Sequence, residues 1–216
     1  MKLHIALGAA MIVAAAAPAY ADQGDLLVRG RAILVAPTEK SGTVQPSFPG
    51  AHVAVDNSIA PELDFTYMLT NRIGAELILG TTKHHVSGRD GLDSLGRIAG
   101  TWVLPPTLTL QYHFAPLAKV RPYAGVGFNY TFFYNDKASD ALNNAIGKTA
   151  VRLKDSAGYA VQAGLDFDLT PRIFANIDVK YIDIDTTARL TTGNAVNRVR
   201  VSLDPIVVGV GIGTRF

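Results

Sequence analysis

The residues best suited by type to do chemistry lie in one short segment. It contains His84, His85, Ser87, Asp90, Asp93 and Ser94. A hydroxyl nucleophile, a base and an orienting acid are the minimum set for hydrolytic catalysis. However, the two histidines are adjacent, so on a strand only one of them could face a site. The segment also lacks the Gly-x-Ser-x-Gly turn of serine hydrolases. We therefore predict no enzymatic activity and no catalytic residue.

Metal and cofactor patterns are equally weak. The two histidines with Asp90 match no recurring ligand spacing for zinc. Asp183 and Asp185 lack the regular oxygen spacing of a calcium loop. Gly125 and Gly127 are followed by no predicted helix, which a nucleotide-binding turn requires, so inward-facing glycines in a narrow barrel explain them better. The sequence predicts no metal site and no cofactor.

Charge and length limit the remaining classes. The chain has 216 residues, no cysteine and a formal net charge of +2. A nucleic-acid-binding protein would need a clustered basic surface, which this balance argues against. One domain is the expectation at this length.

The N-terminus has the pattern of a secretory signal peptide. Lys2 precedes an apolar stretch over residues 3–17, and Ala19-Tyr20-Ala21 has small residues where a signal peptidase cleaves. We predict a cleaved signal peptide over residues 1–21 and a single domain over residues 22–216. An exported chain of this kind can be soluble in the periplasm or can cross the outer membrane as a barrel.

Hydrophobic periodicity points to strands. In residues 107–114, which read Thr-Leu-Thr-Leu-Gln-Tyr-His-Phe, apolar and polar residues alternate strictly. Compatible segments cover residues 26–36, 60–69, 73–82, 122–133, 159–168, 175–181 and 206–216. Eight strands result, each close to the roughly 9–11 residues that cross a bilayer at a tilt. The predicted fold class is all-β, an eight-stranded antiparallel transmembrane β-barrel.

The predicted connections alternate in length. Residues 70–72, 115–121 and 169–172 form short turns. The long connections are residues 37–58, 83–104, 134–155 and 185–198. Short turns at one end and long loops at the other are typical of outer-membrane barrels. We expect the turns and both termini in the periplasm and the long loops outside the cell.

Aromatic residues favour a membrane barrel over a soluble one. Tyr67 and Tyr112 on the periplasmic side, and Tyr130 and Tyr159 on the outer side, fall on the apolar faces near the strand ends. Two such girdles mark the membrane interfaces. The chain ends on Phe216, in phase with the apolar face of the last strand, which resembles the signal that barrel-assembly machinery reads. A soluble lipocalin-like barrel, with its apolar face inward, is the alternative.

Strand parity also predicts what fills the barrel. The lower, periplasmic half receives a polar set: Arg29, Arg31, Glu76, Gln111, His113, Gln162, Asp166, Asp168, Asn176, Asp178, Lys180 and Arg215, with Lys180 near the upper boundary. Because the signs are mixed, these side chains can pair and form a structural plug. An ion pathway is the alternative interpretation.

The upper half is predicted to be apolar. Its inward residues are Ile33, Val35, Ile78, Phe133, Ile182, Ile184 and Leu203. By the same parity Glu62 and Asp64 fall among them and break the pattern. An apolar upper lumen suits a pocket that accepts a small hydrophobic molecule from outside. The alternative is that these residues only fill space.

Several segments resemble the OmpW family of small outer-membrane barrels. They are Leu104-Pro105-Pro106-Thr107-Leu108, the stretch Arg121-Pro122-Tyr123-Ala124-Gly125-Val126-Gly127-Phe128-Asn129-Tyr130, and Tyr181-Ile182-Asp183-Ile184-Asp185-Thr186-Thr187. Phe65-Thr66-Tyr67-Met68, Ile73-Gly74-Ala75-Glu76-Leu77 and Leu203-Asp204-Pro205 add to the resemblance, which covers nearly all of residues 22–216.

The resemblance implies an outer-membrane barrel whose hydrophobic channel passes small hydrophobic compounds, with release sideways into the membrane. AlkL-type members of the family are linked to alkane uptake. The expected partners are outer-membrane lipid, small hydrophobic solutes and the barrel-assembly machinery. Lys180, Glu62 and Asp64 depart from the expected apolar channel, and Lys180 could pair with either acid across the lumen. A structural or surface-binding barrel without transport is the alternative function, and the sequence does not indicate the oligomeric state.

Overall fold

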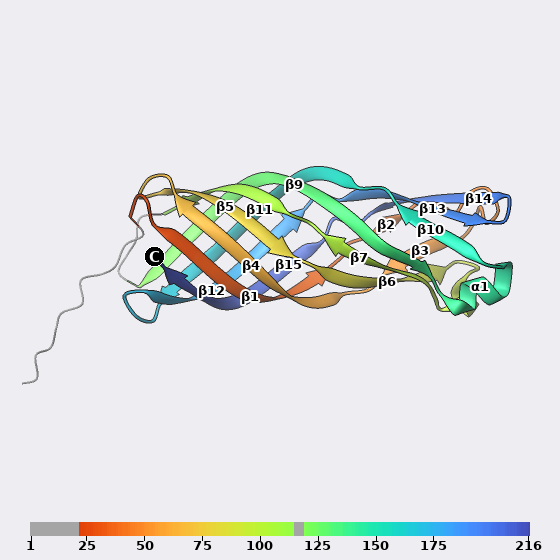
Figure 1. Cartoon of the computed structure of the whole chain (residues 1–216), viewed down its shortest axis with the longest axis horizontal. Coiled ribbons are helices and arrows are strands. Elements are labelled where there is room, and N and C mark those ends of the chain that lie inside the picture. Colours follow the sequence, from red (N-terminus) through yellow and green to blue (C-terminus); the bar gives the residue numbers. More distant parts are fainter. Residues whose placement is uncertain (1–21, 115–118) are drawn as a thin grey trace, which may run out of the picture.

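The computed structural model describes residues 22–114 and 119–216. The predicted signal peptide lies outside the described residues. The described chain forms an elongated barrel in which most residues belong to antiparallel strands (Figure 1). Among these residues, no helix is both long enough and apolar enough to cross a membrane.

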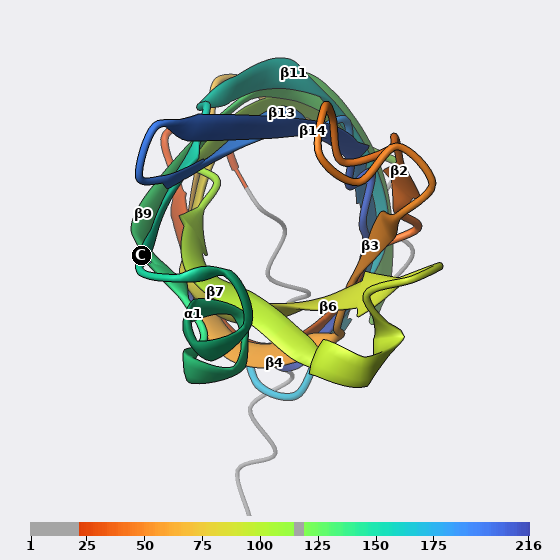
Figure 2. The ribbon, with the colours of Figure 1, turned by 90° about the vertical axis from the view of Figure 1, so that its right-hand side faces the viewer.

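Eight strands form the closed wall. They are β1 (Leu26–Ala36), β4 (Ser58–Met68), β5 (Ile73–Gly80), β8 (Thr107–His113), β9 (Val120–Ala138), β11 (Ser156–Asp168), β12 (Ile173–Ile182) and β15 (Ile206–Arg215). Each pairs with its neighbour in the antiparallel sense, and β1 pairs with β15 to close the ring. Figure 2 shows the ring seen along the barrel. Closure leaves no free strand edge, which a lipid environment requires.

The two faces of the wall are inverted relative to a soluble barrel. Along β1 every second residue is buried, and the buried set includes Arg29 and Arg31. Outward residues of the wall are apolar and exposed, as at Ile59, which is 78% exposed, Val126 and Ile212. An apolar exterior around a charged interior is stable only where lipid covers the outside. The predicted fold class and the inverted faces are confirmed.

The predicted long loops contain further strands. In one group, β3 (His52–Val55), β6 (Thr82–Arg89) and β7 (Arg97–Leu104) pair in series and join the upper part of β9. A second group pairs in the order β10 (Thr149–Leu153), β13 (Asp185–Thr192), β14 (Ala195–Ser202) and β2 (Lys40–Ser41). These strands raise the wall above the membrane. Many of their residues are polar on both faces, so the alternation is weak in sequence, but cross-strand pairing stabilises them.

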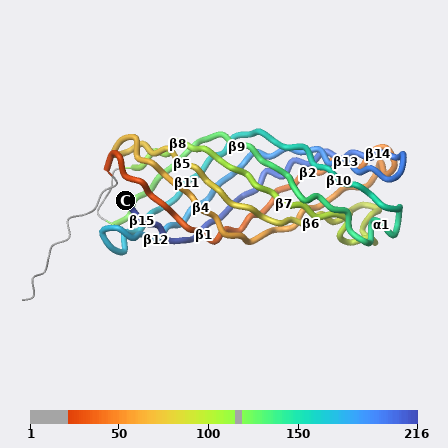
Figure 3. Tube along the Cα trace, in the orientation of Figure 1, coloured from red at the N-terminus to blue at the C-terminus, as the bar shows by residue number. Residues whose placement is uncertain are grey.

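Two short helices complete the extracellular end. The 3-10 helix η1 (Asp93–Leu95) lies between β6 and β7, and α1 (Asp140–Ile146) lies between β9 and β10. The Ser139 hydroxyl accepts a hydrogen bond from the Leu142 amide at 3.1 Å and so caps the start of α1. The trace in Figure 3 places the C-terminus and the start of β1 at the opposite end, beside the short turns. The barrel is therefore polarised between a periplasmic and an extracellular end.

Candidate functional site

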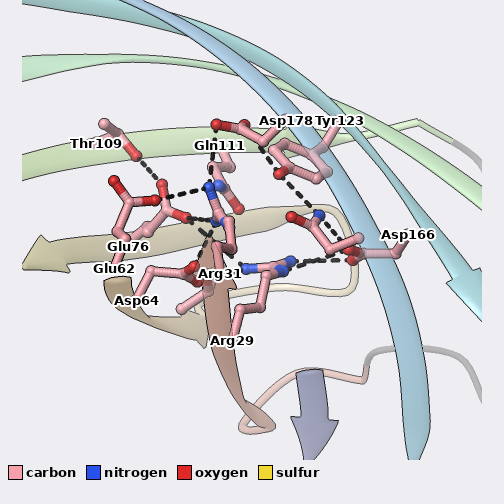
Figure 4. Close-up of polar contacts among 12 residues, drawn as sticks. Arg29, Arg31, Glu62, Asp64, Glu76, Thr109, Gln111, Tyr123, Asp166 and Asp178 are labelled. Carbon is pink, nitrogen blue, oxygen red and sulfur yellow. Dashed lines mark hydrogen bonds and ion pairs between the residues drawn. The ribbon is translucent and has the colours of Figure 1, made fainter. Parts of the chain in front are cut away.

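The lower barrel is filled by an ion-pair network that starts at Arg29. Its guanidinium donates hydrogen bonds to Asp64 at 3.0 Å, Thr66 at 2.8 Å and Asp166 at 3.0 Å (Figure 4). Arg29 comes from β1, and its partners come from β4 and β11. Its side chain is fully buried. The cation is thus held by one carboxylate from the neighbouring strand β4 and one from β11 across the lumen, an arrangement that offsets the cost of burying charge.

Arg31 forms the next layer. It contacts Asp64, and its charged nitrogens lie 3.2 Å from Glu62, 3.3 Å from Glu76 and 3.0 Å from Asp178. Glu76 also accepts a hydrogen bond from the Thr109 hydroxyl at 2.8 Å. Positive and negative groups therefore alternate across the whole width of the lumen.

The periplasmic end of the network is built on an aromatic ring. The Phe174 ring has three guanidinium groups around it, those of Arg29, Arg121 and Arg215, at 5.4, 5.4 and 5.8 Å from its centroid. Asp168 pairs with Arg121 at 2.6 Å and with Arg215 at 3.1 Å. Such cation–π contacts are favourable where water is excluded. This packing fills the periplasmic end of the lumen.

The structure buries all but one of the twelve predicted polar residues. The buried ones are Arg29, Arg31, Glu76, Gln111, His113, Gln162, Asp166, Asn176, Asp178, Lys180 and Arg215, and Asp168 is half-buried. Four further members of this network were not predicted: Thr66, Arg121, Tyr123 and Phe174. Strand parity could have found Tyr123, because residues 122–133 alternate. Phe174 was not recognisable, because an apolar ring gives no sign that it packs against cations.

Two acids connect the charged network with the apolar upper residues. Asp64 stands directly opposite Ile78 in the sheet, and its carboxylate pairs with Arg29 and Arg31. Glu62 lies at the boundary, where Lys180 donates to its Oε1 at 2.7 Å. Lys180 also lies 2.8 Å from Asp178.

Above this boundary lies an apolar cavity of about 300 Å³. All seven residues of the predicted apolar set line it: Ile33, Val35, Ile78, Phe133, Ile182, Ile184 and Leu203. Each is buried. Glu62, in strand β4, also lines the cavity and reaches it from the network below. The lumen thus changes from charged to apolar within about one layer of side chains.

Residues from the extracellular segments extend this cavity upward. Phe48, Leu92, Leu95, Leu142 and Ile146 line it. Leu142 and Ile146 come from α1, and Leu95 comes from η1. These residues were not predicted, because isolated apolar residues in a predicted loop carry no periodic signal. The helices therefore cover part of an apolar space that the wall strands alone would leave open.

His84 and His85 both contact Asp56. His84 Nδ1 lies 2.8 Å from the Asp56 carbonyl oxygen, and its Nε2 lies 3.0 Å from the Thr82 hydroxyl. His84 lies in β6, above the membrane, and burial lowers the pKa of its imidazole. The neutral ring thus adds no charge to the cavity wall at neutral pH. His85 Nδ1 lies 3.0 Å from the Asp56 carboxylate. Within residues 22–114 and 119–216, no group of three or more His, Cys, Asp or Glu residues could hold a metal ion.

Phe216 ends the wall at the seam between the first and last strands. Its amide donates to the Leu26 carbonyl oxygen at 3.0 Å, and the Leu26 amide donates to the Phe216 carbonyl oxygen at 3.1 Å. The aromatic side chain is 72% exposed. It therefore points outward, on the face that lipid covers.

A closed barrel with a lipid-facing wall, a charged floor and an apolar upper lumen is an outer-membrane β-barrel. The chain belongs to the OmpW family, whose family model matches residues 22–216. It is 38% identical to outer membrane protein W of Escherichia coli (strain K12) over 196 residues, 90% of each chain. It is also 29% identical to outer membrane protein AlkL of Ectopseudomonas oleovorans over 171 residues, 79% of this chain and 71% of AlkL.

A solved structure agrees with this assignment. The crystal structure of the outer membrane protein OprG from Pseudomonas aeruginosa superposes with a TM-score of 0.85 at 31% identity. The match covers 91% of this chain and 98% of OprG. The predicted family and the predicted outer-membrane location are confirmed.

Proposed function

We propose that this barrel takes up small hydrophobic molecules from outside the cell and releases them sideways into the outer membrane. The observation that carries the proposal is an apolar cavity of about 300 Å³ directly above a floor of buried ion pairs. A hydrophobic solute gains free energy on leaving water for such a cavity. Passing down through the network would require separating paired buried charges, which is costly. Release through the wall avoids that cost.

A weak seam in the wall supports a lateral route. The pairing between β9 and β11 ends at Thr131 and Ser156. Just above, side-chain carboxylates replace the backbone ladder: the Phe133 amide donates to Asp155 at 3.1 Å, and the Leu153 amide donates to Asp136 at 2.9 Å. Among the described residues, no strand pairing joins β9 to β10.

The seam connects the cavity with the membrane interface. Phe133 and Leu153 line the cavity on its inner side. The outward neighbours of Phe133, Phe132 and Tyr134, are exposed aromatic residues. Aromatic girdles mark the depth at which a barrel wall meets the lipid headgroups. A solute that leaves at this seam would therefore enter the outer leaflet.

The test is solute flux into proteoliposomes with Ile78→Asp. Ile78 lines the cavity, and a carboxylate there would be unpaired among apolar groups. We expect uptake of a fluorescent hydrophobic solute to fall by about tenfold. Ile78→Leu conserves volume and polarity and should keep normal flux. Ile78 stands opposite Asp64 in the sheet, so Phe133→Asn provides a second polar substitution away from the network.

Folding is checked in parallel by heat-modifiable migration in gels. If both polar variants fold and insert normally while flux is unchanged, the cavity only fills space. The barrel would then be a structural or surface-binding protein without transport.

A further inference from the structure

Five cations form two rows across the outer face of the β10–β13–β14 sheet. Arg152 stands directly opposite Arg189, and Arg189 stands directly opposite Arg198. In the row below, the Lys154 amide donates to the carbonyl oxygen of Thr187, which stands opposite Arg200. All five side chains are exposed. We call these five residues the arginine rows.

The arginine rows lack internal compensation. Within the part of the chain that the structure describes, none of the five cations has a carboxylate within 4.0 Å of its charged nitrogen atoms. Nearby acids are engaged elsewhere, since Asp155 accepts from the Phe133 amide and Asp185 accepts from the Ser202 hydroxyl. Directly opposed like charges destabilise a strand pair. A fold that keeps three arginines in register without acids is suited to an anionic partner.

Position and geometry favour phosphate as the anion. A guanidinium presents a planar fork of donors that matches phosphate oxygens. A shallow cleft beside the rows is lined by Arg198 and Arg200 together with the polar residues Thr43, Gln45 and Thr187. Several donors therefore converge on one patch of the wall.

The height of this patch above the membrane indicates which molecules supply the phosphate. Thr187 follows Tyr181 by six positions, which is at most about 20 Å of extended strand. The Tyr181 ring lies 5.9 Å from the ring of Tyr159, which belongs to the predicted outer aromatic girdle. The lower row therefore lies just above the membrane, and the upper row lies about 7 Å higher. Their side chains point sideways from the wall. They therefore face the layer of phosphorylated sugars that neighbouring outer-leaflet lipids present at this height.

We propose that the arginine rows bind phosphate groups of the outer-leaflet glycolipid, lipopolysaccharide, and so anchor the extracellular part of the wall. Basic clusters next to a membrane gain binding energy from anionic headgroups, and each charge adds to the gain. This inference does not depend on whether the cavity transports solutes.

The test is binding of fluorescent lipopolysaccharide to the folded barrel in neutral detergent. We expect Arg189→Gln/Arg198→Gln to weaken binding about thirtyfold, and the same loss for the native chain when the glycolipid is dephosphorylated. The control is Arg89→Gln/Arg97→Gln, which removes two exposed arginines from β6 and β7 on the opposite wall (Figure 2). Its affinity should stay within about twofold of the native value.

The melting temperature of one variant should change in opposite directions without and with lipopolysaccharide. In neutral detergent, Arg189→Gln should raise the melting temperature slightly, because it relieves repulsion from both neighbours. With saturating lipopolysaccharide, the same variant should melt below the native chain, because ligand binding no longer stabilises it as much. Equal affinity of all variants, or insensitivity to dephosphorylation, would overturn the proposal. So would equally tight binding of inorganic phosphate, since that would indicate a site for free anions.

Discussion

Lys180 is buried at the boundary between the charged network and the cavity. Its ammonium lies 2.7 Å from Glu62 and 2.8 Å from Asp178. Buried pairs of this kind contribute little net stability compared with well-packed apolar residues, but removing one partner leaves a buried charge uncompensated. The Lys180 ammonium therefore helps to balance the negative charges of Glu62 and Asp178 at the floor of the cavity.

This residue allows a prediction about stability. Lys180→Met should lower the free energy of unfolding by about 3–5 kcal/mol, because Glu62 and Asp178 lose a shared cation. Lys180→Met/Glu62→Gln should recover part of the loss, since a neutral amide needs no counter-charge. Urea unfolding of the barrel in detergent, followed by tyrosine and tryptophan fluorescence, measures both variants. Identical urea midpoints for the native chain and the single variant would show that Lys180 is not coupled to these acids.

At the scale of elements, the extracellular wall consists of two separate sheets. The β3–β6–β7–β9 group and the β10–β13–β14–β2 group meet at the β9/β10 seam through side chains. They also meet where the Val53 amide donates to the Ser41 hydroxyl at 3.1 Å. Side-chain contacts open at a lower cost than a continuous backbone ladder. The seams are thus the places where the wall can part while the barrel below stays closed.

A cross-link across the β9/β10 seam tests its role in release. The chain has no cysteine, so a disulfide within it can form only between the two introduced cysteines. Asp136→Cys/Leu153→Cys replaces the residues joined by the hydrogen bond at 2.9 Å. We expect oxidation to reduce hydrophobic-solute flux by about tenfold and reduction to restore it.

The matched control places the link inside one sheet. Ala150→Cys/Thr191→Cys joins directly opposed residues of β10 and β13, which are already paired. Oxidation of this pair should leave flux unchanged. If the seam link forms completely and flux persists, solutes leave by another route.

At the scale of the whole molecule, closure depends on the two chain ends. Strand β1 pairs with β15 from Leu27–Arg215 to Ala36–Ile206, and Leu26 and Phe216 exchange hydrogen bonds beyond that ladder. Long-range closure of this kind forms late, because the intervening chain must be ordered first. A terminal residue on the lipid-facing side remains accessible until the barrel closes.

Phe216 variants separate assembly in cells from intrinsic stability. Phe216→Ala keeps the backbone hydrogen bonds and removes the exposed ring. We expect its yield of membrane-inserted, heat-modifiable barrel in cells to fall several-fold, while refolding of the purified chain in detergent stays near normal. Phe216→Tyr, which retains an aromatic ring, should assemble like the native chain. Normal insertion of Phe216→Ala in cells would remove the ring's role as an assembly signal.

The sequence by itself determined the barrel and the direction in which its side chains face. The alternation in residues 107–114 and the repeat of long and short connections are local properties of the chain. Parity along each strand then sorted Arg29, Gln162 and Ile182 to the inside without any knowledge of their partners. The apolar upper lumen was predicted in the same way, and Asp64 and Glu62 were placed inward beside it.

The tertiary structure decided which of these inward residues meet. Arg29 pairs with Asp166 across 137 positions of sequence, and Lys180 pairs with Glu62 across 118. Such contacts depend on how far each strand is shifted along its neighbour, and a shift of two residues keeps the alternation intact while changing every pair. The same holds for the arginine rows, because Arg152, Arg189 and Arg198 come into line only through the pairing of three strands. Periodicity fixes the face of a residue, and only the register of the closed sheet fixes its height.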